Sequence, residues 1–442
     1  MATTAARRGI AAALASAAYL VLGSCAPGPA PGTQPAPEPA PEAAPPPEPI
    51  PGVEPPSDAS AEPEIRVGLA VGVRSATVGG GARLVVTDPA GSRLAEIPAG
   101  ERWQLGNPGV GITATSPAGG SSSPTDAMVV AGAAADDPVE VNGRSYRGLV
   151  QVLRAAGGIT VVNRLPMELY LQGVVSAEMG RRSLAEHEAL RAQAVVSRTY
   201  AHRNLRRWKA QGFDVYASVS DQVYGGLAAE TPEGREAVRS TRGWVLTWGG
   251  APIDAFFYST CGGRTAEGTE VFRAANRAYL RSVADVDERG IAYCAISPRY
   301  RWREEWTAGA LLATLRRTLP EVSGTPAARV TAVRDVRVAY RTASGRVGEL
   351  AVGLPGEEVR IDAPRVRNVL RTPKGELLRS SAFDLTVTSA GHAVTRLVAD
   401  GGGAGHGVGF CQWGAVGRSR AGHDYQRILA AYYPGARLDR FY

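Results

Sequence analysis

One carboxyl group, that of Glu178, stands among apolar residues and could act as a proton donor. It follows the run Val174-Val175 and directly precedes Met179. Apolar surroundings disfavour the ionised form of a carboxyl group, so its pKa rises and it can stay protonated near neutral pH. Alternatively, the carboxylate could cap the start of the helix that follows, or form an ion pair there. Glu178 is therefore a candidate general acid with a structural alternative.

Cys261 lies in a strand-turn segment, YSTCGG at residues 258–263, and allows three interpretations. A catalytic thiolate would need a histidine partner, for which His406 is the best candidate. A metal site would need several ligands, and no histidine or second cysteine lies within a few residues, so a structural metal near Cys261 is a less favoured alternative. No cofactor is expected. A disulfide with Cys294 needs only export to an oxidising compartment, and it is the interpretation we favour.

A glycine-rich stretch, GHGVGFCQWG at residues 405–414, combines a permissive backbone with polar and aromatic side chains. Glycines let a backbone approach a ligand closely or adopt a positive φ. Gln412 offers a hydrogen-bond donor and acceptor, and Trp413 offers a flat stacking face, which together suit a sugar chain. The alternative is that His406 and Trp413 only pack the loop against the core.

A long helix near residues 183–210 must position part of this chemistry. Ser183 and Glu186 have the spacing of a capping box, and apolar residues recur at intervals of three and four. Arg198 and Tyr200 lie two residues apart on this helix and so point in different directions. Arg198 could bind sugar or form a structural ion pair, and Tyr200 could stack on a sugar or belong to the core.

The rest of the pattern predicts an α+β fold of mostly antiparallel strands with a few helices. Short strand-like runs separated by turns fill the chain from residue 65 to residue 159, giving a β-rich N-terminal part. A strand followed by a helix is expected over 161–179. Further strands are expected over 243–248, 253–258, 333–340, 349–353 and 382–387, and further helices over 307–317 and 425–432.

The first 63 residues have the pattern of export and attachment signals. Residues 1–24 carry two arginines and then an apolar stretch, as in a signal peptide, and end before Cys25 as in a bacterial lipoprotein whose cysteine is acylated. A secretory signal with an incidental cysteine is the alternative. Residues 25–63 are rich in proline and predict a disordered, extended tether.

The amino-acid composition excludes several classes of protein and indicates what kind of partner the protein binds. Hydrophobic residues make up 44 % of the chain and charged residues 21 %, which excludes a wholly disordered protein. After residue 24 no apolar run reaches the about 20 residues of a membrane span. The formal net charge of +7 suits an anionic partner such as a cell-wall polymer or a lipid headgroup. Because no basic run is interleaved with aromatic residues, nucleic acid is not expected.

Several motifs in a fixed order resemble the SpoIID/LytB family, that is, stage II sporulation protein D and amidase-enhancer proteins. They are EALRAQAVVSRTYA at 188–201, STCGGRT at 259–265, GHGVGFCQWGA at 405–415 and ILAAYYPG at 428–435. The stretch DQVYGG at 221–226 matches a further family motif and carries Gln222 and Tyr224, whose amide and phenol suit sugar hydroxyls. A buried, hydrogen-bonded turn is the alternative for these two residues.

The resemblance implies a domain division and a function. We expect a signal peptide at 1–24, a tether at 25–63, a β-rich region at 64–150 and a SpoIID/LytB-like domain at 151–442. Enzymes of the family are lytic transglycosylases that cut peptidoglycan glycan strands free of stem peptides, and their catalytic acid corresponds to Glu178. Other members enhance a cell-wall amidase, so the alternative is a non-catalytic enhancer of an N-acetylmuramoyl-L-alanine amidase.

The chain departs from the family pattern at three positions near these motifs. Gly180 replaces the usual proline after the acid, Ala404 replaces a tryptophan, and Cys411 replaces a small residue.

The expected substrate contacts are Arg198, Tyr200, Gln222, Tyr224, Tyr258, Ser259, His406, Gln412 and Trp413. The expected partners are glycan strands, an amidase and, through a lipid on Cys25, a membrane surface. This combination predicts an exported protein of the cell envelope.

Overall fold

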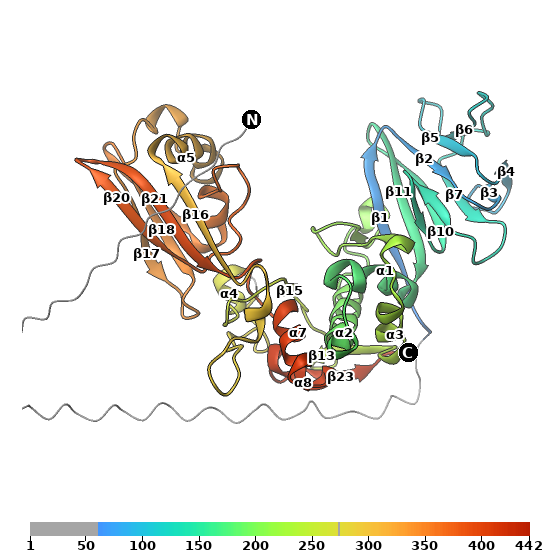
Figure 1. Ribbon diagram of the computed structural model, residues 1–442. Helices are drawn as coiled ribbons and strands as arrows, with labels where there is room; N and C mark the ends of the chain where they lie inside the picture. The colour runs from blue at the N-terminus through green and yellow to red at the C-terminus, as the bar shows by residue number, and fades with distance from the viewer. Residues whose placement is uncertain (1–60, 273–274) are drawn as a thin grey trace, which may run out of the picture. The chain divides into compact units, whose positions relative to one another are not determined.

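The structure is a computed structural model that describes residues 61–272 and 275–442 (Figure 1). The predicted signal peptide, Cys25 and the predicted tether up to residue 60 lie outside the described residues. Within them, no helix is both long and apolar enough to cross a lipid bilayer.

Two sheets of mostly antiparallel strands form the N-terminal part, as the sequence predicts. In the described chain the larger sheet has the order β12-β1-β11-β10-β7-β3-β4, and Figure 1 shows β1, β11, β10 and β7 side by side. Its strands are β1 (Glu64–Val73), β3 (Leu84–Thr87), β4 (Arg93–Ile97), β7 (Ala127–Gly132), β10 (Leu149–Ala155), β11 (Gly158–Pro166) and β12 (Val215–Tyr216). The smaller sheet contains β2 (Ser75–Gly79), β5 (Arg102–Gly106), β6 (Thr113–Thr115), β8 (Val139–Val141) and β9 (Arg144–Tyr146).

The larger sheet connects directly to the helices that carry the first family motifs. β1 pairs with β11 from Glu64↔Pro166 to Val73↔Ile159, and the chain passes from β11 directly into a helix. Alternate residues of β1, such as Ile65 and Val67, are fully buried because successive side chains of a strand point to opposite faces. The expected boundary at residue 150 lies inside β10, so the division of the chain at that point remains a prediction.

Helices α1 (Met167–Met179), α2 (His187–Arg203) and α3 (Pro232–Ser240) follow. The capping box between Ser183 and Glu186 is present, and it caps the short 3₁₀ helix η1 (Leu184–Glu186) that leads into α2. The long helix ends at Arg203, earlier than the predicted residue 210. The chain turns at Arg206, which has a φ of 67° and whose N–H donates to Asp214 Oδ1 over 2.7 Å.

The C-terminal elements return to pack on α2. Strand β13 (Trp244–Trp248) pairs with β14 (Ala251–Pro252) and with β23 (Arg437–Arg440) near the C-terminus. Strand β15 (Phe257–Tyr258) pairs in parallel with β22 (Phe410–Cys411). The remaining elements here are η2 (Lys209–Gln211), η3 (Gly226–Ala229), α4 (Gly268–Val271), η4 (Tyr293–Ile296), α7 (Gln412–Arg420) and α8 (Tyr425–Tyr432). The prediction for the last helix is confirmed.

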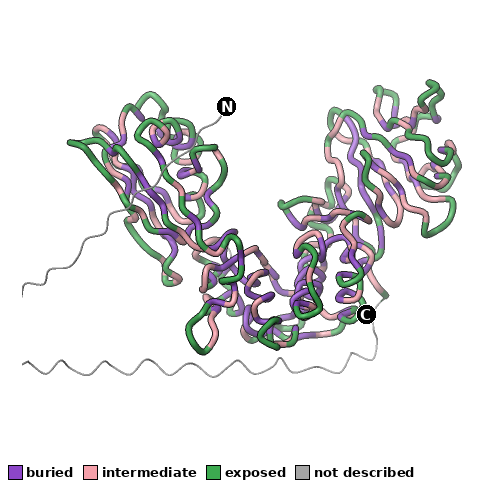
Figure 2. The backbone as a smooth tube through the Cα atoms, viewed as in Figure 1, coloured by how far each residue is buried: buried purple, intermediate pink, exposed green. Residues whose placement is uncertain are grey.

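Between β15 and β22, residues from Trp302 to Ala399 enclose a hydrophobic core of their own (Figure 2). Its largest fully buried side chain is Trp306, on a three-stranded sheet of β16 (Arg301–Thr307), β21 (Ala393–Gly402) and β20 (Phe383–Ala390). The other elements are α5 (Ala308–Ser323), η5 (Ala327–Arg329), β17 (Asp335–Arg341), β18 (Val347–Leu354), β19 (Glu357–Asp362), η6 (Ala363–Arg365) and α6 (Val366–Val369). The fold is α+β with mostly antiparallel strands.

Candidate active site

Glu178 lies in the last turn of α1, where two hydrogen-bond donors hold its carboxyl group. The N–H of Val223 donates to Oε1 over 2.7 Å, and Nε2 of Gln412 lies 3.4 Å from Oε2. Val174 and Val175 belong to the same helix. Burial raises the pKa of Glu178 above its ordinary value, although both donors pull it in the opposite direction.

The helix that carries Glu178 ends in a backbone conformation that only glycine adopts readily. Gly180 has φ 69° and ψ −175°, and its N–H donates to the carbonyl of Ser176 over 2.8 Å. Proline has no N–H and fixes φ near −65°, so the residue usual in the family could not form this helix end. The glycine that replaces the family's proline at this position therefore helps to position the Glu178 carboxyl group.

We expect Gly180→Ala to lower the free energy of unfolding by about 1–3 kcal/mol, the usual cost of forcing a side chain into this φ/ψ region. A Cβ atom at this position meets no other atom within 4 Å, so the loss would come from the backbone alone. Urea denaturation measures it. Gly309→Ala is the matched control, because its Cβ also meets nothing and its helical backbone favours alanine. An unchanged stability of the Gly180→Ala protein would contradict this account of the helix end.

A cleft of about 880 Å³ opens beside Glu178 and gathers residues from distant parts of the chain. It is lined by carboxylates, arginines, aromatic rings and small polar groups, among them Glu178, Arg182, Tyr200, Arg207, Asp221, Phe256, Phe257, Tyr258, Ser259, Phe272, Arg299, Gly405, His406, Gln412 and Trp413. Six of the predicted contacts lie in this lining, namely Tyr200, Tyr258, Ser259, His406, Gln412 and Trp413. The sequence did not single out Arg182, Arg207 or Arg299, because no local motif marks them, and it gave Asp221 no role although Asp221 begins the stretch DQVYGG.

Gln412 and Trp413 begin helix α7 and face the cleft beside the acid. Nε2 of Gln412 lies 3.4 Å from both Glu178 and the buried Gln193 Oε1, so the amide is shared between the acid and the core. The guanidinium of Arg182 stacks over the Trp413 ring at 4.5 Å from its centroid. The two residues thus present a hydrogen-bonding group and a ring in the same cleft as Glu178.

His406 is neutral and bonded at both ring nitrogens. The N–H of Val408 donates to Nδ1 over 3.2 Å, so the proton is on Nε2, which donates to the carbonyl of Phe257 over 2.9 Å. Burial lowers its pKa to about 4. Because both nitrogens bind backbone groups, His406 shapes the glycine-rich loop, and the interpretation of His406 as the base of a Cys261 nucleophile is wrong.

Asp221 is the second carboxylate of the cleft, and both of its oxygens are occupied. Oδ1 accepts from the hydroxyl of Tyr200 over 2.7 Å and from Nη1 of Arg207 over 2.9 Å. Oδ2 accepts from the N–H of Tyr216 over 2.8 Å. Asp221 therefore holds Tyr200 at the wall of the cleft and has no free oxygen facing it.

Three predicted contacts lie behind the cleft, and the structure corrects them. Arg198 is fully buried and forms a bidentate ion pair with Glu168, both N···O distances being 2.8 Å. Gln222 is fully buried and accepts from the hydroxyl of Tyr170. Tyr224 is buried as well. Each residue has found a partner in the core, so the structural alternative holds for all three.

Cys261 and Cys294 meet, as the sequence predicts, although their Sγ atoms lie 3.3 Å apart and the structure joins them by no bond. Their disulfide remains a prediction. Cys411 is the third buried free cysteine of the described chain, and its Sγ accepts from the N–H of Cys261 over 3.1 Å.

Comparison with known proteins matches two regions to family models. Residues 155–248 match the stage II sporulation protein (SpoIID) family, and residues 292–409 match a domain of unknown function, DUF8618. The first match contains Glu178, and the second covers nearly all of the segment with its own core.

Three relatives cover most of the described chain. An uncharacterized protein of Brachyspira hyodysenteriae is 31 % identical over 68 % of this chain and 73 % of its own length. Stage II sporulation protein D of Bacillus subtilis is 27 % identical over 63 % of this chain and 75 % of its own length. The amidase enhancer of B. subtilis is 26 % identical over 61 % of this chain and 40 % of its own length. The order of the motifs, the family-model match and these relatives together show that the chain belongs to the SpoIID/LytB family.

Proposed function

We propose that the protein is a lytic transglycosylase that cuts glycan strands of peptidoglycan, with Glu178 as its only acid and base. The observation that carries this proposal is the position of the Glu178 carboxyl group, which has a raised pKa and lies in a cleft beside Gln412 and Trp413. An acid that stays protonated near neutral pH can give its proton to a glycosidic oxygen.

The reaction needs one carboxyl group in two roles. Protonated Glu178 gives its proton to the oxygen between two sugars, and the bond from that oxygen to C1 breaks. The resulting carboxylate removes the proton from the C6 hydroxyl of the same muramyl sugar, whose O6 bonds to C1. The products are a free 4-hydroxyl and a 1,6-anhydro ring, and no water is consumed.

The state of Asp221 favours this reaction over hydrolysis by a carboxylate pair. An ordinary glycosidase uses a second carboxylate as nucleophile or as the base that activates water. The oxygens of Asp221 instead accept hydrogen bonds from Tyr200, Arg207 and Tyr216. Among the cleft residues that the structure describes, Glu178 is therefore the one carboxyl group available for acid–base catalysis.

The charge of the cleft supports a strand without stem peptides as the substrate. Arg182, Arg207 and Arg299 contribute guanidinium groups to the lining. Removal of a stem peptide leaves a carboxylate on each muramyl sugar, and guanidinium groups bind carboxylates through charged hydrogen bonds. Trp413 supplies a ring face for the sugar itself.

Mass spectrometry of the products tests this proposal. The full-length protein is incubated with glycan strands that carry stem peptides and with strands freed of them by an amidase. We expect 1,6-anhydro-muramyl ends from the stripped strands and far fewer from the peptide-bearing ones. The proposal fails if neither substrate yields anhydro ends, or if the products are reducing ends.

The pH dependence of cleavage follows from the raised pKa of Glu178. The acid must be protonated to act, so kcat/KM should fall as pH rises through that pKa. Because burial raises the pKa above the ordinary value of 4.5, we expect this alkaline limb to lie above pH 4.5. A rate measured across pH on stripped strands locates it. A limb at or below the ordinary value would contradict the proposed environment of Glu178.

A non-catalytic role as enhancer of an N-acetylmuramoyl-L-alanine amidase is the second candidate, favoured by the relative named amidase enhancer. In that case the isolated protein releases nothing from stripped strands. It would accelerate a partner amidase, and Glu178→Gln would leave that acceleration unchanged. The same product analysis with and without the amidase separates the two functions.

We also propose that the protein works in the cell envelope. A signal peptide over 1–24, an acylated Cys25 and a tether over 25–63 would hold the folded residues near a membrane surface and within reach of the wall. Labelling cells with a fatty-acid analogue should mark the wild-type protein and not Cys25→Ser.

A further inference from the structure

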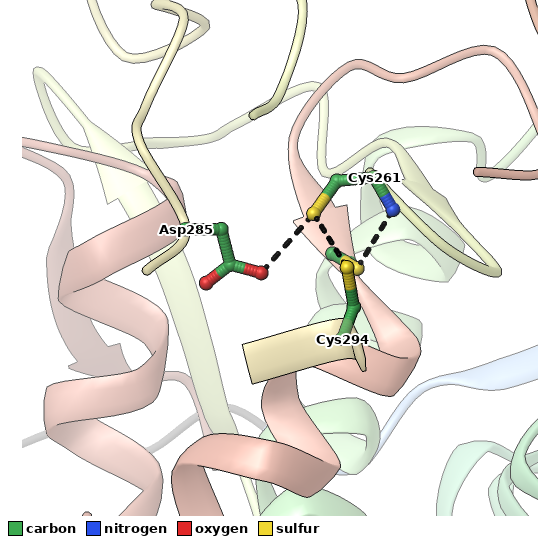
Figure 3. Close-up of side chains that lie close together, drawn as sticks. Cys261, Asp285 and Cys294 are labelled. Atoms are coloured by element: carbon green, nitrogen blue, oxygen red, sulfur yellow. Dashed lines mark hydrogen bonds between the residues drawn. The ribbon is translucent and has the colours of Figure 1, made fainter. Parts of the chain in front are cut away.

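Four potential metal ligands meet in the interior, from parts of the chain far apart in sequence. Cys261 follows β15, Asp285 lies in a loop, Cys294 lies in η4, and Cys411 ends β22. Their ligand atoms all lie within 4.8 Å of one another. Figure 3 shows Cys261 between Asp285 and Cys294, with its Sγ 3.2 Å from Asp285 Oδ2 and 3.3 Å from Cys294 Sγ. For comparison, two sulfur ligands of a tetrahedral zinc ion lie about 3.8 Å apart.

The surroundings of the sulfur atoms suit thiolates. Two backbone N–H groups, those of Cys261 and Gly414, donate to Cys411 Sγ over 3.1 and 3.2 Å. The N–H of Gly263 donates to Cys261 Sγ over 3.3 Å. Hydrogen bonds to a group's charged form favour that form, and such donors are common around metal-bound sulfur. The backbone is thus arranged for negative charge on sulfur.

As thiolates, these buried groups would require a positive charge to balance them. Cys261 is 2 % exposed, and Asp285, Cys294 and Cys411 are fully buried. Two arginines of the described chain lie beside the cluster. Nε of Arg418 lies 2.9 Å from Asp285 Oδ1, and Nη2 of Arg346 donates to the carbonyl of Cys261 over 3.3 Å. Two guanidinium groups cannot balance three thiolates and a carboxylate in a dry interior, whereas together with a divalent cation they would supply four positive charges against four negative ones.

Residues outside the cluster hold the Asp285 carboxylate in place by hydrogen bonds, as is usual for metal ligands. Arg418 holds Oδ1, and the hydroxyl of Tyr432 donates to Oδ2 over 3.0 Å. The absence of a side chain at Gly414 makes room for this arrangement, because a Cβ there would lie 2.1 Å from Asp285 Oδ2 and 2.2 Å from the Tyr432 hydroxyl. Partners of this kind fix the direction of a ligating oxygen.

We propose that Cys261, Asp285, Cys294 and Cys411 bind one structural divalent cation of the thiolate-preferring class, with zinc the best fit. Three sulfur ligands select soft or borderline cations, and four ligands without an open position are typical of structural zinc sites. Binding Zn²⁺ releases the three thiol protons, so affinity increases with pH. This inference does not depend on the proposed function.

A metal accounts for the cluster better than a disulfide does. A bond between any two of the three cysteines would use two of the four groups and leave the third thiol outside the bond. The cation would use all four groups and would join the turn after β15 to η4 and to the start of α7. Gln412, the neighbour of Cys411, would thereby be held beside Glu178.

Metal analysis of the full-length protein tests the proposal without an activity assay. We expect about one zinc per chain after purification without chelators. After stripping, Co²⁺ should restore the near-ultraviolet charge-transfer absorption that thiolate ligands give. Tyr432→Phe keeps the ring and removes only the donor to Asp285, and it should weaken the metal affinity about 10–100-fold.

Cys294→Ser and Asp285→Asn should each lose the metal, whereas Asp287→Asn should keep it. Asp287 is the matched control, since it lies two residues from Asp285 but pairs with Arg289 and lies outside the cluster. The proposal is overturned if wild-type protein loaded with Zn²⁺ or Co²⁺ holds no ion, or if mass spectrometry finds a disulfide among these cysteines in metal-free native protein. It is equally overturned if Cys294→Ser and Asp285→Asn both retain a full equivalent.

Discussion

Glu178→Gln should abolish the release of anhydro-muramyl products while leaving strand binding close to that of the wild type. Glutamine keeps the shape of the side chain and can still accept from the N–H of Val223, but it has no proton to give. General acid–base catalysis by one side chain is worth about 10²–10⁴-fold in rate, so we expect a loss of at least that order. Single-turnover product release and co-sedimentation with insoluble strands measure the two quantities separately.

Glu236→Gln provides the control for this experiment. Glu236 is a carboxylate of α3 that pairs with Arg239, and it does not line the cleft. Its replacement should change neither binding nor product release. Full turnover by Glu178→Gln would remove Glu178 from the mechanism, and a loss of binding equal to the loss of rate would make it a binding residue instead.

Arg198→Met should cost about 3–5 kcal/mol of folding free energy, because it leaves the carboxylate of Glu168 buried without its counter-charge. Arg198 is 0 % exposed and also donates to the carbonyls of Trp244 and Val238. The hydroxyl of Tyr442 donates to the same carboxylate over 2.6 Å, so the pair ties α1 and α2 to the end of the chain. Urea denaturation measures the loss.

The double variant Arg198→Met with Glu168→Leu should recover much of this stability, since no unpaired charge remains. Arg203→Met is the control on the same helix. Its partner is Asp254 at 3.0 Å, and its side chain is 43 % exposed, so the loss should stay within about 1 kcal/mol. Equal losses for Arg198→Met and Arg203→Met would contradict the assignment of a buried pair.

The same pair makes the fold sensitive to acid. Burial alone would raise the pKa of Glu168, but Arg198 and Tyr442 bring it below the ordinary value of 4.5. A lowered pKa contributes stability that is complete above pH 4.5 and is lost as pH falls through the folded-state value. The double variant should therefore lose less stability between pH 5 and pH 3 than the wild type does.

Local patterns predicted most of the elements correctly. Short strand-like runs between turns predicted the β-rich part before residue 159, and the last helix has its predicted bounds, Tyr425–Tyr432. The end of α2 was placed too late because Arg206 turns the chain through a contact with Asp214, which no helix propensity reports. Of the strand expected over 253–258, only its last two residues form a strand, β15, whereas β14 ends at Pro252, before the predicted range.

Residues of the candidate site could be predicted only where they belong to a recognisable sequence motif. Gln412 and Trp413 stand in one conspicuous stretch and do line the cleft. Arg198 and Tyr224 also stand in motifs, but their partners Glu168 and Asn163 lie far away in the sequence, so the sequence offers their burial only as an alternative. The same holds for Asp285 and Cys411, which join Cys261 and Cys294 only after the chain has folded.

The origin of the oxygen atoms in the products tests the central claim most directly. The wild-type protein is incubated with stripped strands in H₂¹⁸O, and the new ends are analysed by mass spectrometry. An acid that works without water predicts anhydro ends containing no ¹⁸O, with none formed by Glu178→Gln. Reducing ends that carry ¹⁸O, or anhydro ends formed equally well by Glu178→Gln, would contradict it.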